Sequence, residues 1–178
     1  TSPFKNEYYK GAMYALGGAS FRYNVTISNL STEISPFLQH KKSKPFFNDL
    51  RVYEPEFPFY AYPDMVILCD TPKFPDEVKD TILNPAVLIE VLSKSTEQYD
   101  KSVKLGMYRA ARTFKEYILI YQDRPFIECF YKVDDFNWTQ GGFKGLEAKI
   151  QIKTIDLDLN LANIYADLNF DFQFDIAK

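Results

Sequence analysis

The spacing of apolar residues predicts a long amphipathic helix near the start of the chain. Between Phe21 and Leu38, apolar side chains recur at steps of three and four residues, at Ile27, Leu30, Ile34 and Phe37/Leu38. Ser20 is a typical N-cap residue. Because proline disfavours the helical conformation of the residue before it, Pro36 predicts that this helix ends near Ser35.

Further along, short apolar runs bounded by turn residues predict buried strands. Met65–Cys69 and Ala86–Leu92 have the composition of strands covered on both faces. Tyr117–Gln122 and Phe126–Lys132 predict a hairpin around Asp123-Arg124-Pro125. Weaker patterns predict a small hairpin over Tyr8–Leu16 around Lys10-Gly11, and short strands between Pro36 and Pro85, where eight of the ten prolines lie. Towards the C-terminus they predict turns at Gly141-Gly142 and Gly145, a strand at Ala148–Ile152 and a short helix over Leu161–Leu168.

A second helix is predicted over Lys101–Phe114. Its apolar face carries Val103, Met107, Ala110/Ala111 and Phe114. Lys104, Tyr108 and Arg112 recur every four residues beside that face, as in a solvated helix flank. Helix, strands, helix and strands in this order predict a mixed α/β fold, with residues 1–178 forming one domain.

Composition excludes several classes of protein. The 178 residues are 46% hydrophobic and include 16 Phe, 13 Tyr and 1 Trp, so the chain is not disordered. Cys69 and Cys129 lie in apolar runs without the spacing of a zinc site, which favours two buried thiols over a disulfide. No apolar run approaches the roughly 20 residues of a membrane span, and we expect a cytoplasmic protein.

Charge is unevenly distributed. The formal net charge of −3 argues mildly against a protein whose whole surface binds nucleic acid. However, Ser93–Glu116 carries six basic and three acidic residues, whereas Thr154–Lys178 carries five acidic residues and one lysine. Lys94, Arg109 and Arg112 in the basic region are therefore candidate phosphate contacts, although two ordinary solvated surfaces would have the same composition.

Two carboxylates are out of place in this pattern. Glu90 interrupts the apolar run Ala86–Leu92, where an ionised side chain costs several kcal/mol unless it is paired, protonated or bound to a metal. Asp64 opens the preceding strand, 26 positions earlier, and the connection allows the two strands to be neighbours. Paired carboxylates suit Mg²⁺. The alternatives are an acid at an open strand end or paired with a core Lys or Arg, and a Pro63-Asp64 turn without chemistry.

Several segments resemble the Uma-two family of predicted endonucleases, which have the restriction-endonuclease-like PD-(D/E)XK core. The segments that carry the resemblance are Tyr62–Leu68, Asn84–Thr96 with its Glu90-Val91-Leu92-Ser93, then Asp100, Lys104, Tyr108 and Glu116-Tyr117, and at the start Glu7–Gly11 and Ser28–Leu30. The resemblance spans roughly Glu7 to Tyr165. It implies a central mixed β-sheet flanked by helices and a DNA-hydrolysing enzyme.

The resemblance also implies roles for individual residues. Asp64 and Glu90 become the metal-binding acids for Mg²⁺, or Mn²⁺, with the Val91 carbonyl as a further ligand. The lysine usually found two residues after the second acid is Leu92 here. Lys104 on the following helix is the substitute that we expect, with Lys101 in reserve and Tyr108 in support.

Two positions depart from the family pattern. Ala12 stands where the family usually has glutamate, and Tyr23-Asn24 stands where it usually has histidine. Glu7 or Glu33 would have to compensate. The alternative function is therefore a catalytically degenerate nuclease fold that acts as a nucleic-acid-binding or interaction module.

Restriction-like nucleases commonly pair, which leads us to expect a homodimer. Part of the aromatic surplus lies in the proline-rich region, where some rings must be near the surface: Phe46-Phe47, Tyr53 and Phe57–Tyr60.

Overall fold

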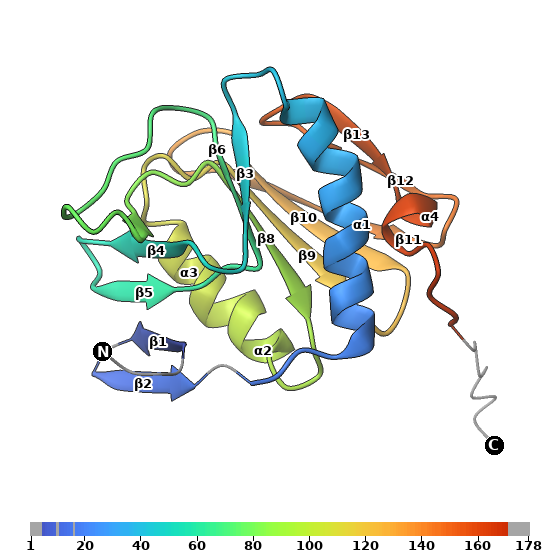
Figure 1. The fold of residues 1–178 in the computed structure, drawn as a ribbon, viewed down its shortest axis with the longest axis horizontal. Coiled ribbons are helices and arrows are strands. Elements are labelled where there is room, and N and C mark those ends of the chain that lie inside the picture. The colour runs from blue at the N-terminus through green and yellow to red at the C-terminus, as the bar shows by residue number, and fades with distance from the viewer. Residues whose placement is uncertain (1–4, 10, 16, 171–178) are drawn as a thin grey trace.

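The protein is described by a computed structural model that covers residues 5–9, 11–15 and 17–170 (Figure 1). A six-stranded mixed sheet has the order β11-β10-β9-β8-β6-β3. Its strands are β3 (Lys44–Phe47), β6 (Met65–Leu68), β8 (Val87–Leu92), β9 (Glu116–Tyr121), β10 (Phe126–Lys132) and β11 (Trp138–Lys144). β8 and β9 are parallel, and the other neighbours in this sheet are antiparallel.

A five-stranded sheet has the order β2-β1-β5-β4-β7, and a two-stranded sheet pairs β12 with β13. The strands of the five-stranded sheet are β1 (Asn6–Tyr9), β2 (Ala12–Ala15), β4 (Arg51–Glu54), β5 (Phe59–Ala61) and β7 (Thr81–Ile82). The two-stranded sheet consists of β12 (Lys149–Ile152) and β13 (Leu157–Asn160). The helical segments are α1 (Phe21–Leu38), α2 (Glu97–Tyr99), the π-helical turn η1 (Asp100–Lys104), α3 (Leu105–Tyr108) and α4 (Leu161–Ile164).

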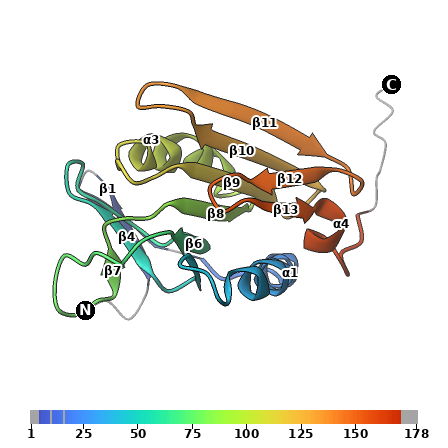
Figure 2. The same ribbon diagram turned by 90° about the horizontal axis from the view of Figure 1, so that it is seen from above.

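The six-stranded sheet separates two cores, because successive side chains of a strand point to opposite faces. Val87, Ile89 and Val91 of β8 pack on the face that α1 covers. Leu88 and Leu92 pack on the other face, together with side chains of α3. Figure 2 shows α1 and α3 on opposite sides of β8.

Most of the predicted elements are confirmed. The buried strands β6 and β8, the hairpin of β9 and β10 and the strand β12 lie where the apolar runs place them. Among the described residues of the N-terminal hairpin, Gly11 has the positive φ of +85° that its turn requires; Lys10 and Leu16 lie outside the described residues. Gly145 likewise turns the chain with φ +93°.

The predicted end of α1 is wrong. The side chain of Ser20 accepts a hydrogen bond from the Tyr23 N–H, as expected of a cap. However, the helix continues through Pro36 to Leu38. Leu38 is fully buried in the core on this face, and its packing holds the last helical turn in place after the proline.

Three other predictions are also wrong, two of them in the length of a helix and one in the type of structure. The second helix begins at Glu97 and ends at Tyr108 instead of Phe114, because the chain must return to β9, where the Lys115 N–H bonds the Ala86 carbonyl. Gly141-Gly142 lie inside β11, paired with β10, and not in a turn. The last helix is limited to α4.

The cysteines are free, as expected, although Cys69 and Cys129 are only partly buried. Within the described part of the chain, no helix has the length and apolar composition to cross a membrane.

Candidate active site

The strand pairing brings Asp64 and Glu90 together. β6 runs antiparallel to β8 with Met65 opposite Ile89, so Asp64, just before β6, lies beside Glu90. The Val91 N–H donates to Asp64 Oδ2 at 2.7 Å, and the Asp64 N–H lies 3.4 Å from Glu90 Oε2. The expectation that these strands are neighbours is confirmed.

Lys104 reaches Glu90 from the helical side of the sheet. Glu90 shares its face with Leu88 and Leu92, and that face is covered by η1 and α3. Lys104 Nζ lies 3.0 Å from Glu90 Oε1. Because Lys104 is only 4% exposed, the interpretation of its helix stripe as a solvated flank is wrong.

The other two residues of that predicted stripe, Tyr108 and Arg112, lie in different environments. Tyr108 is buried, and its hydroxyl lies 3.4 Å from Glu90 Oε1. Arg112 is exposed beyond the end of α3. Instead of a stripe, the π-helical turn η1 directs both of its ends, Asp100 and Lys104, into the buried cluster. Such wide turns occur frequently at functional sites.

Two further carboxylates surround the ammonium group of Lys104. Glu7 Oε1 lies 2.9 Å from Lys104 Nζ, and Asp100 Oδ1 lies 3.2 Å from it. Glu7 is 1% exposed and also accepts a hydrogen bond from the Tyr62 N–H at 3.0 Å. Glu33 instead accepts from Asn163 and is not part of this cluster.

Tyr23 contacts the candidate metal ligand directly. Its hydroxyl lies 2.6 Å from Asp64 Oδ1 and 2.7 Å from Asn48 Oδ1. Burial and, to a smaller extent, the charge of Asp64 raise the pKa of Tyr23. The phenol therefore stays protonated and donates a hydrogen bond to Asp64. Ala12, the other departure from the family pattern, is exposed on β2.

The cluster has more acid than base. Among the described residues, Lys104 is the one basic side chain within ion-pair distance of Glu7, Glu90 and Asp100, and Asp64 lies next to Glu90. Burial raises the pKa of Asp64 to about 6 and holds the pKa of Glu90 well above its usual value, despite the nearby lysine. An excess of buried carboxylates over ammonium groups favours a proton or a cation at the site.

Lys104 remains charged in this environment. Burial acts to lower its pKa, but the carboxylates of Glu90, Asp100 and Glu7 together hold the pKa well above the usual value. An ammonium group of this kind stabilises negative charge and does not accept a proton.

The remaining predicted residues lie elsewhere. Lys101 Nζ is 2.7 Å from Glu128 Oε2 and 2.8 Å from the Tyr121 hydroxyl, in a separate cluster. Lys94 follows the carboxyl end of β8, whereas Arg109 packs over the Trp138 ring at 5.0 Å.

The segment that carries Arg109 and Arg112 leads to Lys115, which bonds Ala86 at the other end of β8. Lys94 therefore does not share a surface with the two arginines.

The donor set is compatible with Mg²⁺. Hard cations take oxygen ligands, and Mg²⁺ is commonly held by one or two carboxylates together with water and substrate phosphate. Asp64 and Glu90 supply two adjacent carboxylates. In the part of the chain that the structure describes, no group of three or more His, Cys, Asp or Glu side chains is arranged around a metal position.

The mixed sheet with helices on both faces agrees with the restriction-endonuclease-like fold that the resemblance implies, and its antiparallel neighbours β6 and β8 bring the two acids together. Residues 1–162 match the Uma2 family model, which is described as "Putative restriction endonuclease". The chain belongs to this family.

The chain is also similar to individual known proteins. Two uncharacterized proteins of the cyanobacterium Synechocystis are similar: one is 33% identical, covering 83% of each chain, and one is 30% identical, covering 93% of this chain and 86% of the relative. A crystal structure described as a putative nuclease belonging to DUF820, from Anabaena variabilis, superimposes with a TM-score of 0.74 at 15% identity. It covers 92% of this chain and 90% of the other, and it supports the fold.

Proposed function

We propose that this protein is a Mg²⁺-dependent endonuclease that hydrolyses phosphodiester bonds of DNA. The observation that supports the proposal best is the pairing of Asp64 and Glu90 in a buried cluster with more carboxylates than ammonium groups. Such a cluster favours a further cation or a proton at the site, because buried like charges repel. The family to which the chain belongs supports the same reaction.

Asp64 and Glu90, with the Val91 carbonyl, would hold Mg²⁺ or Mn²⁺. A divalent cation bound there polarises a phosphate and lowers the pKa of bound water. Lys104 stabilises the negative charge that develops on the phosphate oxygens. Tyr108 fixes Glu90 from the buried side, and Tyr23 fixes Asp64 from α1.

Cleavage of supercoiled plasmid tests the proposal. We expect nicking with Mg²⁺ or Mn²⁺ but not with EDTA, and loss of nicking in Glu90→Gln. Glu33→Gln is the matched control, because it makes the same change in an acid outside the cluster. Equal nicking by Glu90→Gln and the wild type would show that Glu90 has no role in hydrolysis.

A catalytically degenerate nucleic-acid-binding module is the second candidate. It is favoured by the Lys104 ammonium group, which forms an ion pair with Glu90 Oε1 at 3.0 Å and would compete with a metal cation for that oxygen. Titration calorimetry with Mn²⁺ separates the two functions. Binding that is lost in Asp64→Asn supports the enzyme, whereas no heat of binding in the wild type supports the module.

The remaining partner proposals concern DNA contacts and self-association. Lys94, and at a separate place Arg109 and Arg112, are proposed to contact phosphates. A homodimer is proposed through the aromatic part of the proline-rich region, where Phe57 is 53% exposed while Phe59 is buried in the core. Sedimentation at micromolar concentration tests it, and a monomer would refute it.

A further inference from the structure

A cavity of about 270 Å³ lies at the carboxyl ends of β8 and β9. Leu92 and Tyr121, the last residues of the two strands, form part of its wall. The side chain of Gln122 lines it, donating to the Leu92 carbonyl at 3.1 Å and accepting a hydrogen bond from the Ser20 hydroxyl. The cavity thus lies between the start of α1 and the end of the parallel strand pair.

The acids that line this cavity are already engaged. Asp123 forms an ion pair with Arg124 at 3.2 Å. Glu97 accepts a hydrogen bond from the Tyr121 hydroxyl at 3.1 Å and lies 3.9 Å from Lys101 Nζ. Each acid therefore lies within ion-pair distance of a cation from outside the cavity lining, and Glu97 shares Lys101 with Glu128.

The two cations that line the cavity form no ion pair with a side chain in the described part of the molecule. Arg22 donates to the neutral Asn169 carbonyl at 2.8 Å and lies over the Phe170 ring at 5.1 Å. Lys94 is exposed and forms no ion pair with any of the described residues. The cavity consequently carries two positive charges that form no ion pair with the residues that the structure describes, which suits an anionic ligand.

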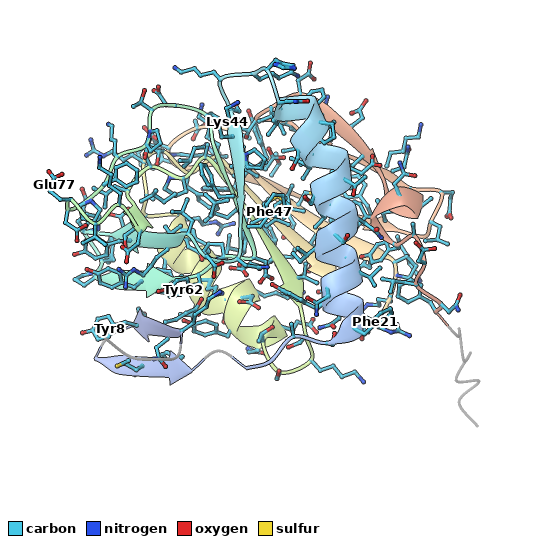
Figure 3. All side chains as sticks on the ribbon, in the orientation of Figure 1. Tyr8, Phe21, Lys44, Phe47, Tyr62 and Glu77 are labelled. Carbon is cyan, nitrogen blue, oxygen red and sulfur yellow. The ribbon has the colours of Figure 1, made fainter. Side chains whose placement is uncertain are left out.

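Both walls are adjacent along the chain to residues that contact Asp64. Arg22 precedes Tyr23, whose hydroxyl contacts Asp64, and Leu92 follows Val91, whose N–H also donates to Asp64. The lysine-rich loop around Lys44 is at the opposite end of α1 from Phe21, away from this cavity (Figure 3).

We infer that this cavity is a nucleotide subsite. It holds the phosphate next to the scissile one between Arg22 and Lys94. Its volume lies below the range of about 300–1,000 Å³ typical of pockets for drug-sized ligands, which fits one unit of a longer chain. The inference rests on the proposed function, because it names the part of the substrate that binds beside the hydrolytic centre.

NMR titration of the ¹⁵N-labelled protein in EDTA tests binding without cleavage. Thymidine 5′-monophosphate is the probe, and thymidine, which lacks the phosphate, is its control. We expect the monophosphate alone to shift the backbone amide signals of Ser93, Lys94 and Gln122. Equal shifts with thymidine, or shifts confined to other residues, would overturn the inference.

Variants test the two cations. Lys94→Gln and Arg22→Gln are expected to weaken binding of the monophosphate, and of a short DNA duplex in EDTA, by about three- to tenfold each. Arg22→Lys keeps the positive charge and should retain most of the affinity. This variant therefore distinguishes the effect of the charge of Arg22 from the effect of losing its contacts to Asn169 and Phe170. Lys149→Gln, an exposed lysine of β12, is the matched control. An equal loss in Lys149→Gln would indicate non-specific attraction and refute the subsite.

Failure of the subsite can be distinguished from failure of the proposed function. Metal-dependent nicking with an unchanged KM in Lys94→Gln and Arg22→Gln would refute the subsite and leave the endonuclease. Phosphate-dependent binding without any nicking would support the subsite and refute hydrolysis.

Discussion

Replacing Lys104 with methionine should destabilise the folded protein strongly at neutral pH. Methionine keeps much of the apolar stem but removes the ammonium group, which lies within 2.9–3.2 Å of three carboxylates. The side chains of this cluster are at most 5% exposed, so water cannot replace the lost ion pairs. Breaking a buried pair by removing one partner typically costs about 3–5 kcal/mol.

This loss should depend on pH. The pKa of Glu90 is already raised in the folded protein, and without the lysine it rises further. A carboxyl group with a raised folded-state pKa binds protons better in the folded than in the unfolded protein. Stability therefore falls as the pH rises from the ordinary value of about 4.5 through the raised pKa. We expect Lys104→Met to lie closest to the wild type near pH 5 and farthest from it near pH 8.

Urea and thermal unfolding at pH 5, 6.5 and 8 measure the effect. For a chain of this size, 3–5 kcal/mol corresponds to a drop in Tm of about 6–20 °C. Lys101→Met is the matched control, because its side chain is 34% exposed and its shorter ion pair is with one carboxylate, that of Glu128. It should cost about 1 kcal/mol or less. A loss below about 1 kcal/mol for Lys104→Met at pH 8, or an equal loss at pH 5, would refute the description of the cluster as rich in uncompensated acid.

Three further outcomes are expected. Because burial raises the pKa of Asp64 to about 6 and a carboxylate must be ionised to bind a metal, the affinity for Mn²⁺ should fall as the pH decreases through 6. Calorimetry between pH 5 and 7.5 measures this affinity, and an affinity that does not change with pH would argue against Asp64 as a ligand. Tyr23→Phe removes a hydrogen bond that lowers the pKa of Asp64, so the pH dependence of Mn²⁺ affinity should move to higher pH. An unchanged pH dependence would show that Tyr23 contributes packing only. Glu116→Ala should cost about 2–4 kcal/mol in urea unfolding, because the buried carboxylate accepts from the Lys153 and Thr154 N–H groups; a loss below about 0.5 kcal/mol would contradict this.

The sequence was most informative where one periodicity held over a whole element. The run around Glu90 predicted a strand buried on both faces, and its single acid identified the position that needs a partner. The spacing between Asp64 and Glu90 allowed, but did not require, the strands to pair. Prediction failed where packing overrides local preference, as at Pro36, which the buried Leu38 keeps inside the helix.

The long-range contacts of the site could not be read from the pattern. Lys104 and Tyr108 have the spacing of a solvated helix flank, and only the position of η1 and α3 over β8 shows that they are buried. Glu7 is one acid in a short N-terminal strand, and nothing local indicates that it contacts a lysine 97 positions later.

By itself, the sequence determined the mixed α/β fold, the Uma-two resemblance and the two acids that are out of place in apolar surroundings. Hydrophobic periodicity and the cost of a buried charge are local properties, and they can be read along the chain. The resemblance had already suggested Lys104, and the tertiary structure placed its ammonium group against Glu90, Glu7 and Asp100 and the Tyr23 hydroxyl against Asp64. Their positions depend on how helices and strands pack across the sheet, and residue spacing does not encode that arrangement.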